Sequence, residues 1–337
     1  MWGDNYFMDE ELLRVDHLTV KFRTYNGTVT AIDNLDLQLN TNETLGIVGE
    51  SGSGKSVTSL SIMGLLDEDT SSVTGHAFFK GKDLINMPEK EKQHYRGNQL
   101  AMIFQEPMTS LNPLHKCGKQ IMESMLIHEK ISKEEAKNKA IDLLKLVGIP
   151  APEQRFNEYP HQMSGGMRQR IMIAMALACD PQLLIADEPT TALDVTIQAQ
   201  ILELLKELKE RLKMGIIMIT HDLGVVSEVC DRVVVMYTGK VVEQGSIRDI
   251  LDSPMHPYTE GLIAAIPKMK DQKEPLNSID GVVPRLDDMP KGCSFHPRCP
   301  YAMDICKEKR PALSETAEGR KVRCFKYSST EEVEVNP

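Results

Sequence analysis

The stretch that decides the fold reads Gly49-Glu50-Ser51-Gly52-Ser53-Gly54-Lys55-Ser56. It fits the pattern G-x-x-x-x-G-K-[ST] of a phosphate-binding loop, in which glycines let backbone N–H groups wrap a polyphosphate. The apolar run at residues 45–48 is typical of a buried strand, and a stretch compatible with a helix follows the loop. The positive end of that helix would point at the phosphates. The sequence therefore predicts a nucleotide site here.

Within this phosphate-binding loop (residues 49–56), Lys55 would place a cation on the β- and γ-phosphates of ATP, and the Ser56 hydroxyl would bind Mg²⁺. The residues predicted to contact the nucleotide here are Gly49, Ser51, Gly52, Ser53, Gly54, Lys55, Ser56 and Val57.

A second apolar run, residues 183–186, ends in the carboxylates Asp187 and Glu188. If this strand lay beside the strand that feeds the loop, Asp187 would face the Mg²⁺ and Glu188 could polarise an attacking water. An Asp-Glu pair by itself is more often a solvated turn. After four apolar residues, in a chain that carries a phosphate-binding loop, the pair favours the functional interpretation.

Strands and helices are expected to alternate over the first 250 residues. Residues 131–148 predict a helix that begins with a capping box of Ser132 and Glu135. Residues 196–213 predict an amphipathic helix, and residues 216–219 predict a third buried strand. This order is typical of a parallel α/β sheet. Prolines become frequent after residue 250, where we expect a domain boundary.

Composition excludes several classes of protein. The chain has 337 residues, of which 41% are hydrophobic and 26% charged, so wholesale disorder is not expected. The net charge of −10 disfavours a general nucleic-acid binder. No apolar run approaches the roughly 18 residues that cross a bilayer. The first residues lack the basic start of a secretory signal, so we expect the chain to stay in the cytosol.

The segment Met163-Ser164-Gly165-Gly166-Met167 precedes a predicted helix and would form a second anion cradle. One nucleotide does not need two such cradles from one chain, so we expect a dimer in which each chain offers Ser164, Gly165 and Gly166 to its partner's ATP. Here the chain resembles the ATP-binding subunits of ABC transporters, whose signature reads LSGGQ. Met163 and Met167 depart from that signature.

This resemblance implies an α/β P-loop NTPase fold (ABC ATPase) over residues 1–250, with an antiparallel β subdomain and a helical subdomain at about 106–180. The helical subdomain would touch membrane subunits. Its plausible apolar contacts are Met108, Leu111, Pro113 and Leu114.

The same resemblance implies further site residues. Gln105 would reach the Mg²⁺ and the water, and Asp194 would communicate across the dimer. His221 would contact the γ-phosphate, which makes Glu188, His221 and Gln105 the predicted catalytic set. Tyr25 would stack on the adenine, although Phe22 is a rival for that role.

Four of the seven cysteines, Cys293, Cys299, Cys306 and Cys324, fall within the last 45 residues. Their spacing lacks the tight pair that zinc sites usually show. Four loosely spaced thiolates could surround a [4Fe–4S] cluster, and a local excess of Lys and Arg would offset its negative charge. Zinc and the absence of any metal remain alternatives at this point.

The last part of the chain resembles one subfamily, the oligopeptide/dipeptide/nickel importer ATPases. The resemblance rests on His256-Pro257-Tyr258-Thr259, on residues 293–300 and on residues 159–162. It implies a C-terminal extension at residues 251–337, whose four cysteines hold an iron–sulfur cluster in the dipeptide-importer member.

The implied function is an ATP hydrolase that couples MgATP hydrolysis to the uptake of di- or oligopeptides, as a peripheral subunit on the cytoplasmic face of the cell membrane. The implied partners are a paralogous ATPase, two permease subunits and an extracellular substrate-binding protein. Import of nickel or another small solute is an alternative. A soluble ABC ATPase that acts on nucleic acid or ribosomes is disfavoured, because the chain has one set of motifs, no long heptad stretch and an acidic balance.

Overall fold

The computed structural model describes residues 10–25, 27–105, 110–191, 193–266, 279–328 and 333. The chain divides into two compact units. The first unit comprises residues 1–14, 38–43 and 77–217, and the second comprises residues 15–37, 44–76 and 218–337. Four strands contribute residues to both units: β1 (Glu11–Thr24), β2 (Gly27–Asn40), β4 (Ser71–Phe79) and β8 (Gly215–Thr220).

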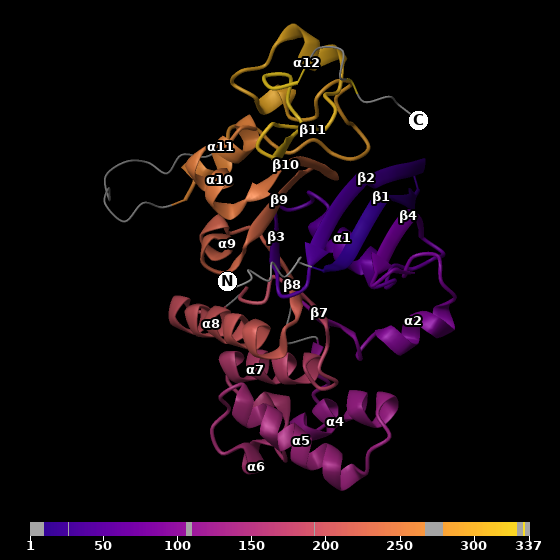
Figure 1. Ribbon diagram of the computed structural model, residues 1–337, viewed down its shortest axis with the longest axis vertical. Helices are drawn as coiled ribbons and strands as arrows, with labels where there is room; N and C mark the ends of the chain where they lie inside the picture. Colours follow the sequence, from indigo (N-terminus) through magenta and orange to yellow (C-terminus); the bar gives the residue numbers. More distant parts are fainter. Residues whose placement is uncertain are drawn as a thin grey trace, which may run out of the picture. The chain divides into compact units, whose positions relative to one another are not determined.

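The first unit combines short strands with most of the long helices. β6 (Leu100–Ile103) and β7 (Leu183–Asp187) pair in parallel. The helices α4 (Cys117–His128), α5 (Lys133–Leu146) and α7 (Gly165–Ala176) pack on one another, as Figure 1 shows. The other elements of this unit are β5 (Lys82–Asp83), α2 (Glu89–Tyr95), α6 (Pro152–Arg155), the 3-10 helix Pro160–Gln162 and α8 (Val195–Leu212).

The second unit is built on a sheet that receives both parallel and antiparallel strands. β3 (Thr44–Val48) pairs in parallel with β9 (Arg232–Tyr237), which pairs antiparallel with β10 (Lys240–Ser246). β12 (Lys321–Val322) adds to the edge of β10, so the C-terminal extension continues the sheet. The remaining elements are α1 (Lys55–Ile62), α9 (Leu223–Val229), α10 (Ile247–Asp252), α11 (Pro257–Ala264), the 3-10 helix His296–Arg298, α12 (Asp304–Glu308) and β11 (Ser314–Glu315).

The predicted elements are confirmed within one or two residues at each end. β3 is buried along its whole length, as its apolar run requires. The capping box at the start of α5 forms: Glu135 N–H donates to Ser132 Oγ at 3.2 Å, and Ser132 N–H donates to Glu135 Oε2 at 2.7 Å. The helix predicted at residues 196–213 is α8. Local signals suffice for these elements because caps and buried strands are short-range features.

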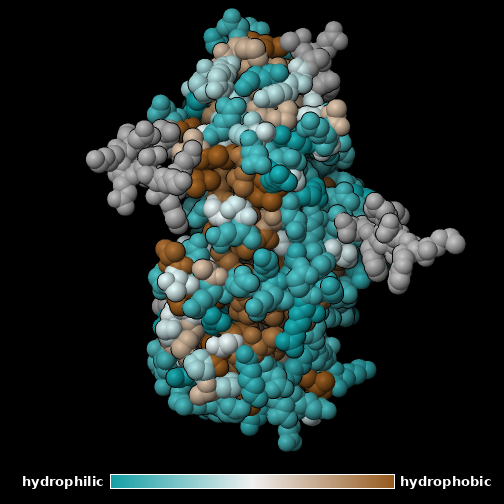
Figure 2. All heavy atoms as spheres, turned by 60° about the vertical axis from the view of Figure 1, so that its left-hand side comes forward, coloured by the Kyte–Doolittle hydropathy of each residue, from teal (hydrophilic) through white to brown (hydrophobic). Residues whose placement is uncertain are grey.

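The face drawn in Figure 2 is mainly hydrophilic and carries hydrophobic residues in interrupted patches. Within the described parts of the chain, every helix is too short or too polar to cross a membrane.

Candidate nucleotide site

The phosphate-binding loop lies between β3 and α1, and glycines decide its path. The backbone angle φ is +154° at Gly49 and +103° at Gly54, a region that other residues rarely adopt. A Cβ at Gly49 would lie 2.2 Å from the carbonyl oxygen of Met236. A Cβ at Gly54 would lie 2.5 Å from Ile32 Cδ1. Larger residues at these two positions would therefore displace the loop.

The interior of this loop carries a cation and an unsatisfied hydroxyl. Lys55 is buried, and its Nζ donates to the carbonyl oxygens of Gly49 at 2.7 Å and Glu50 at 3.0 Å. Ser53 Oγ is buried and has no hydrogen-bond partner among the described residues. A buried hydroxyl without a partner is costly, and a phosphate oxygen would satisfy it. The loop therefore fits a polyphosphate such as that of ATP.

Residues of the C-terminal extension brace this loop through Glu50. The Glu50 N–H donates to the Tyr258 hydroxyl at 2.8 Å. The Glu50 carboxylate accepts two hydrogen bonds from Arg298, at 2.6 and 3.0 Å, and Glu50 thereby raises the pKa of the arginine. This forked geometry fixes the orientation of both partners. Sequence reasoning missed Tyr258 and Arg298 as supports, although both lie in segments that carry the subfamily resemblance.

Two other predicted residues of the second unit are accessible. Tyr25, at the turn after β1, is fully exposed and lines an open cavity of about 480 Å³ with Val29 and Leu286. Phe22 is only half-buried, and it does not line that cavity. His221 directly follows β8 and is exposed. Roles for Tyr25 in adenine stacking and for His221 at the γ-phosphate stay predictions.

In the first unit, the structure brings Gln105 and Glu188 together. Asp187 is the last residue of β7 and is buried. Glu188 follows it with φ of +46°, a strained value for a residue with a side chain. Glu188 Oε2 accepts hydrogen bonds from Gln105 Nε2 at 2.9 Å and from Thr191 Oγ1 at 2.8 Å. Two donors therefore orient the carboxylate that was predicted to act on water.

The signature segment (residues 163–167) begins α7. Ser164 is exposed and caps the helix, because its Oγ accepts from the Met167 N–H at 3.3 Å. A Cβ at Gly166 would lie 2.9 Å from Ile197 Cγ2 in α8. Asp194 caps α8 by accepting from the Ile197 N–H at 2.9 Å. The structure thus brings the serine–glycine edge and Asp194 together in one unit.

The apolar residues predicted to touch membrane subunits divide into different environments. Met108 lies outside the described residues. Leu111 is buried within the chain, so it is not available to a partner. Leu114 is 80% exposed, so its side chain is accessible for contact with a membrane subunit.

The prediction of a [4Fe–4S] cluster, with zinc as its alternative, is wrong. Among the residues that the structure describes, no group of three or more His, Cys, Asp or Glu side chains is arranged to hold a metal ion. The four thiols line one small cavity of about 20 Å³. Burial raises the pKa of Cys293 to about 11 and also raises the pKa of Cys299 and Cys324. In the structure the four side chains line this cavity as free thiols, with Cys306 buried and the other three half-buried.

Comparison with known proteins adds two family matches. Residues 32–191 match the model of the ABC transporter family. Residues 242–306 match the C-terminal region of oligopeptide/dipeptide transporters.

Close relatives span nearly the whole chain. The oligopeptide transport ATP-binding protein AppD of Bacillus subtilis is 51% identical over 94% of this chain and 97% of its own length. The dipeptide transport ATP-binding protein DppD of Escherichia coli is 51% identical over 93% of this chain and 96% of its own length. Among solved structures, the dimeric bacterial ABC transporter cassette MJ0796 is 29% identical with a TM-score of 0.62, over 70% of this chain and 99% of its own.

Proposed function

The chain belongs to the ATP-binding subunits of the ABC oligopeptide/dipeptide transporters, and we propose that it hydrolyses MgATP at the phosphate-binding loop to drive peptide uptake. It has the P-loop fold of an ABC ATPase, with an α/β core, an antiparallel sheet and a helical subdomain. The observation that carries the assignment of the site is the glycine path of residues 49–54 around a buried lysine and an unsatisfied serine hydroxyl.

Binding of the triphosphate uses the residues of this loop. Lys55 Nζ would exchange its bonds to loop carbonyl oxygens for bonds to the β- and γ-phosphates, and the backbone N–H groups at the start of α1 would add to them. Ser56 and Asp187 are the proposed Mg²⁺ ligands, with Gln105 close to Glu188. When bound, Mg²⁺ withdraws negative charge from the phosphate oxygens.

Hydrolysis requires a base for the attacking water. Glu188 would accept a proton from this water. Its carboxylate directly follows the strand that ends in Asp187, and two hydrogen-bond donors orient it. His221 would contact the γ-phosphate from the end of β8. These roles agree with the order of the motifs along the chain.

A second ATPase subunit would complete the site with its own serine–glycine edge. The exposure of Ser164 and Gly165 supports this proposal, because an edge that serves a partner has to be accessible. The dimeric state of the MJ0796 cassette also supports it. We propose a paralogous partner, two permease chains and an extracellular peptide-binding protein, with this chain peripheral on the cytoplasmic face of the membrane.

Co-purification tests this assembly. The tagged chain, extracted from its own cells in mild detergent, is expected to carry two permeases and a second ATPase. The purified assembly, reconstituted into lipid vesicles, should take up a labelled dipeptide in an ATP-dependent manner. It should not take up nickel. Recovery of ribosomes or DNA in place of permeases would overturn the proposal.

A further inference from the structure

The phosphate-binding loop carries a carboxylate of its own, on Glu50. The backbone of this residue takes part in the loop, since its carbonyl oxygen accepts from the Ser53 N–H at 3.2 Å and from Lys55 Nζ at 3.0 Å. A triphosphate is strongly anionic, so a carboxylate in the loop that binds it opposes binding unless a cation compensates its charge. The surroundings of Glu50 therefore bear on how tightly the loop holds ATP.

Arg298 of the extension supplies that cation in a fixed geometry. Its side chain is 3% exposed, and each of the five N–H groups of its guanidinium has an acceptor. Two of these groups reach the Glu50 carboxylate, at 2.6 and 3.0 Å. The others reach the carbonyl oxygens of Ile279 and Asp280, at 3.3 and 3.0 Å, and the Tyr237 hydroxyl at 3.4 Å. The position of the guanidinium is therefore not set by Glu50 alone.

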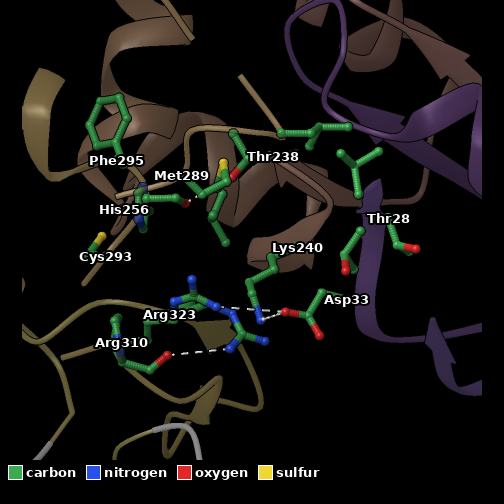
Figure 3. Close-up of a pocket in the computed structure, with 16 residues that line it drawn as sticks. Thr28, Asp33, Thr238, Lys240, His256, Met289, Cys293, Phe295, Arg310 and Arg323 are labelled. Atoms are coloured by element: carbon green, nitrogen blue, oxygen red, sulfur yellow. Dashed lines mark hydrogen bonds and ion pairs between the residues drawn. The ribbon is translucent and has the colours of Figure 1, made fainter. Parts of the chain in front are cut away.

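Aromatic packing fixes the second side chain that holds Glu50, which is Tyr258. The hydroxyl of Tyr258 accepts from the Glu50 N–H at 2.8 Å. Its ring centroid lies 4.7 Å from that of Tyr237 and 5.4 Å from that of Phe295. Phe295 also packs against His256, with ring centroids 5.6 Å apart, and Figure 3 shows these two side chains at the wall of a neighbouring cavity. Closely packed rings have little room to move, so the hydroxyl and the guanidinium reach Glu50 from one rigid cluster.

The pair of Arg298 and Glu50 is unequally exposed. The side chain of Glu50 is 31% exposed, ten times the exposed fraction of the arginine, so the carboxylate keeps some contact with water and the guanidinium keeps almost none. If the arginine were removed, a partly hydrated carboxylate would remain in the loop without a compensating charge and without its forked partner. Both losses would weaken the hold of the loop on an anion.

We propose that Arg298 is a positioning residue for ATP binding, which sets the affinity of the loop for MgATP by compensating and orienting the Glu50 carboxylate. The inference rests on the function proposed above, because it concerns the same nucleotide. It gives the extension a role in nucleotide binding, whereas the residues proposed to contact ATP all precede the extension.

Titration of the full chain with a ribose-labelled fluorescent ATP analogue and Mg²⁺ tests the proposal. Arg298→Gln should weaken binding about tenfold, because an uncompensated charge acts on this scale. Adding Glu50→Gln to that variant should bring the affinity back to within about threefold of the wild type, since neither charge remains. Arg298→Lys should lie between the wild type and Arg298→Gln, because lysine keeps the charge but cannot form the fork. A double variant as weak as Arg298→Gln would overturn the compensation of charge.

A second variant tests the brace without changing any charge. Tyr258→Phe removes only the hydroxyl that accepts from the Glu50 N–H, and it should weaken binding about threefold. Arg96→Gln is the matched control, because Arg96 forms a forked pair with Glu89 in the first unit, at 2.7 and 2.9 Å, and it should bind as the wild type does. Thermal unfolding shows whether each variant is folded. If Arg298→Gln is not, Arg298→Lys and Tyr258→Phe decide the question.

Steady-state hydrolysis by the assembled transporter separates positioning from catalysis. Arg298→Gln should raise the KM for MgATP about tenfold and leave kcat unchanged, because the proposed base Glu188 keeps its two donors. A lower kcat with an unchanged KM would overturn the role in binding. Wild-type affinity in the folded variants of Arg298 and in Tyr258→Phe would overturn the inference as a whole. A wild-type chain that does not bind the analogue would instead overturn the proposed function.

Discussion

Two helices of this chain begin at glycine-containing loops, and their first turns are built differently. α1 begins after Gly54, whose left-handed backbone provides no capping side chain. α7 begins after Ser164, whose hydroxyl caps the helix. The loop before α1 is braced by Tyr258 and Arg298 of the extension. The segment before α7 is braced by its own cap and by the contact of Gly166 with α8.

This difference in capping fits two different roles, a nucleotide-binding loop at the start of α1 and an edge that serves a partner at the start of α7. Without a side-chain cap, the first backbone N–H groups of α1 remain suited to phosphate oxygens. At α7, Ser164 already satisfies one of those groups, so the segment is stable before any nucleotide reaches it. We infer that the α1 loop sets the affinity of the chain for ATP, whereas the α7 segment acts only in the assembly.

The largest effect is expected from a substitution that removes the proposed catalytic base and leaves the first turns of α1 and α7 unchanged. Glu188→Gln removes the proposed base but keeps an acceptor for Gln105 and Thr191. Phosphate release by the assembled transporter should fall at least about 100-fold, since general-base catalysis contributes that much. MgATP affinity should be unchanged. Glu207→Gln on the exposed face of α8 is the control, and undiminished hydrolysis in the Glu188 variant would refute its role.

A smaller effect is expected when the α1 loop loses its cation. Lys55→Ala should weaken MgATP binding to the isolated chain by about 10- to 100-fold, because charge-assisted hydrogen bonds to phosphate are lost. Fluorescence titration with a labelled ATP analogue measures this. Lys206→Ala, which removes an exposed lysine from α8, should bind as the wild type does. Equal binding by both variants would contradict our distinction between the two helix starts.

The brace of the α1 loop should depend on pH through His256. This buried imidazole accepts from the Tyr258 N–H at 3.0 Å, and burial with the nearby Arg323 and Lys326 lowers its pKa from 6.5 to about 3. Below pH 6.5 the unfolded chain binds the extra proton and the folded chain does not. The contribution of neutral His256 to the free energy of unfolding is therefore complete above pH 6.5, and it is lost as the pH falls toward 3.

Urea unfolding at pH 7 and pH 5 checks this dependence. His256→Asn keeps an acceptor for the Tyr258 N–H but does not titrate. Between pH 7 and pH 5 its free energy of unfolding should therefore fall by about 2 kcal/mol less than that of the wild type. Equal losses in the wild type and the variant would show that His256 is not kept neutral by the fold.

The smallest effect concerns the cap of α7. Ser164→Ala should lower the free energy of unfolding by about 1 kcal/mol and leave the MgATP affinity of the isolated chain unchanged. Hydrolysis by the complete transporter should decline, because the edge offered to the partner is altered. Ser132→Ala is matched, since Ser132 caps α5 in the same unit, and it should lower stability without affecting hydrolysis. A large loss of ATP affinity in the isolated Ser164 variant would contradict the division of roles.

Local sequence signals predicted most elements of the fold, whereas the roles that they suggest for the site residues stay predictions. The glycines and Lys55, the capping box at Ser132 and the apolar run before Asp187 each specify their structure over a few residues. The cysteines show where such signals fail. Their density and spacing indicated a cluster, but spacing along the chain does not report how side chains are arranged in space, and no metal-binding group forms among the described residues.

By itself, the sequence determined the phosphate-binding loop, the strand that leads to Glu188 and the serine cap of α7, because each depends on neighbours along the chain. Only the tertiary structure decided that Arg298 holds Glu50 from 248 residues away, and that Lys240 and Arg310 pair with Asp33. Contacts between distant segments arise from how β10 and the extension pack, and no local pattern encodes that packing.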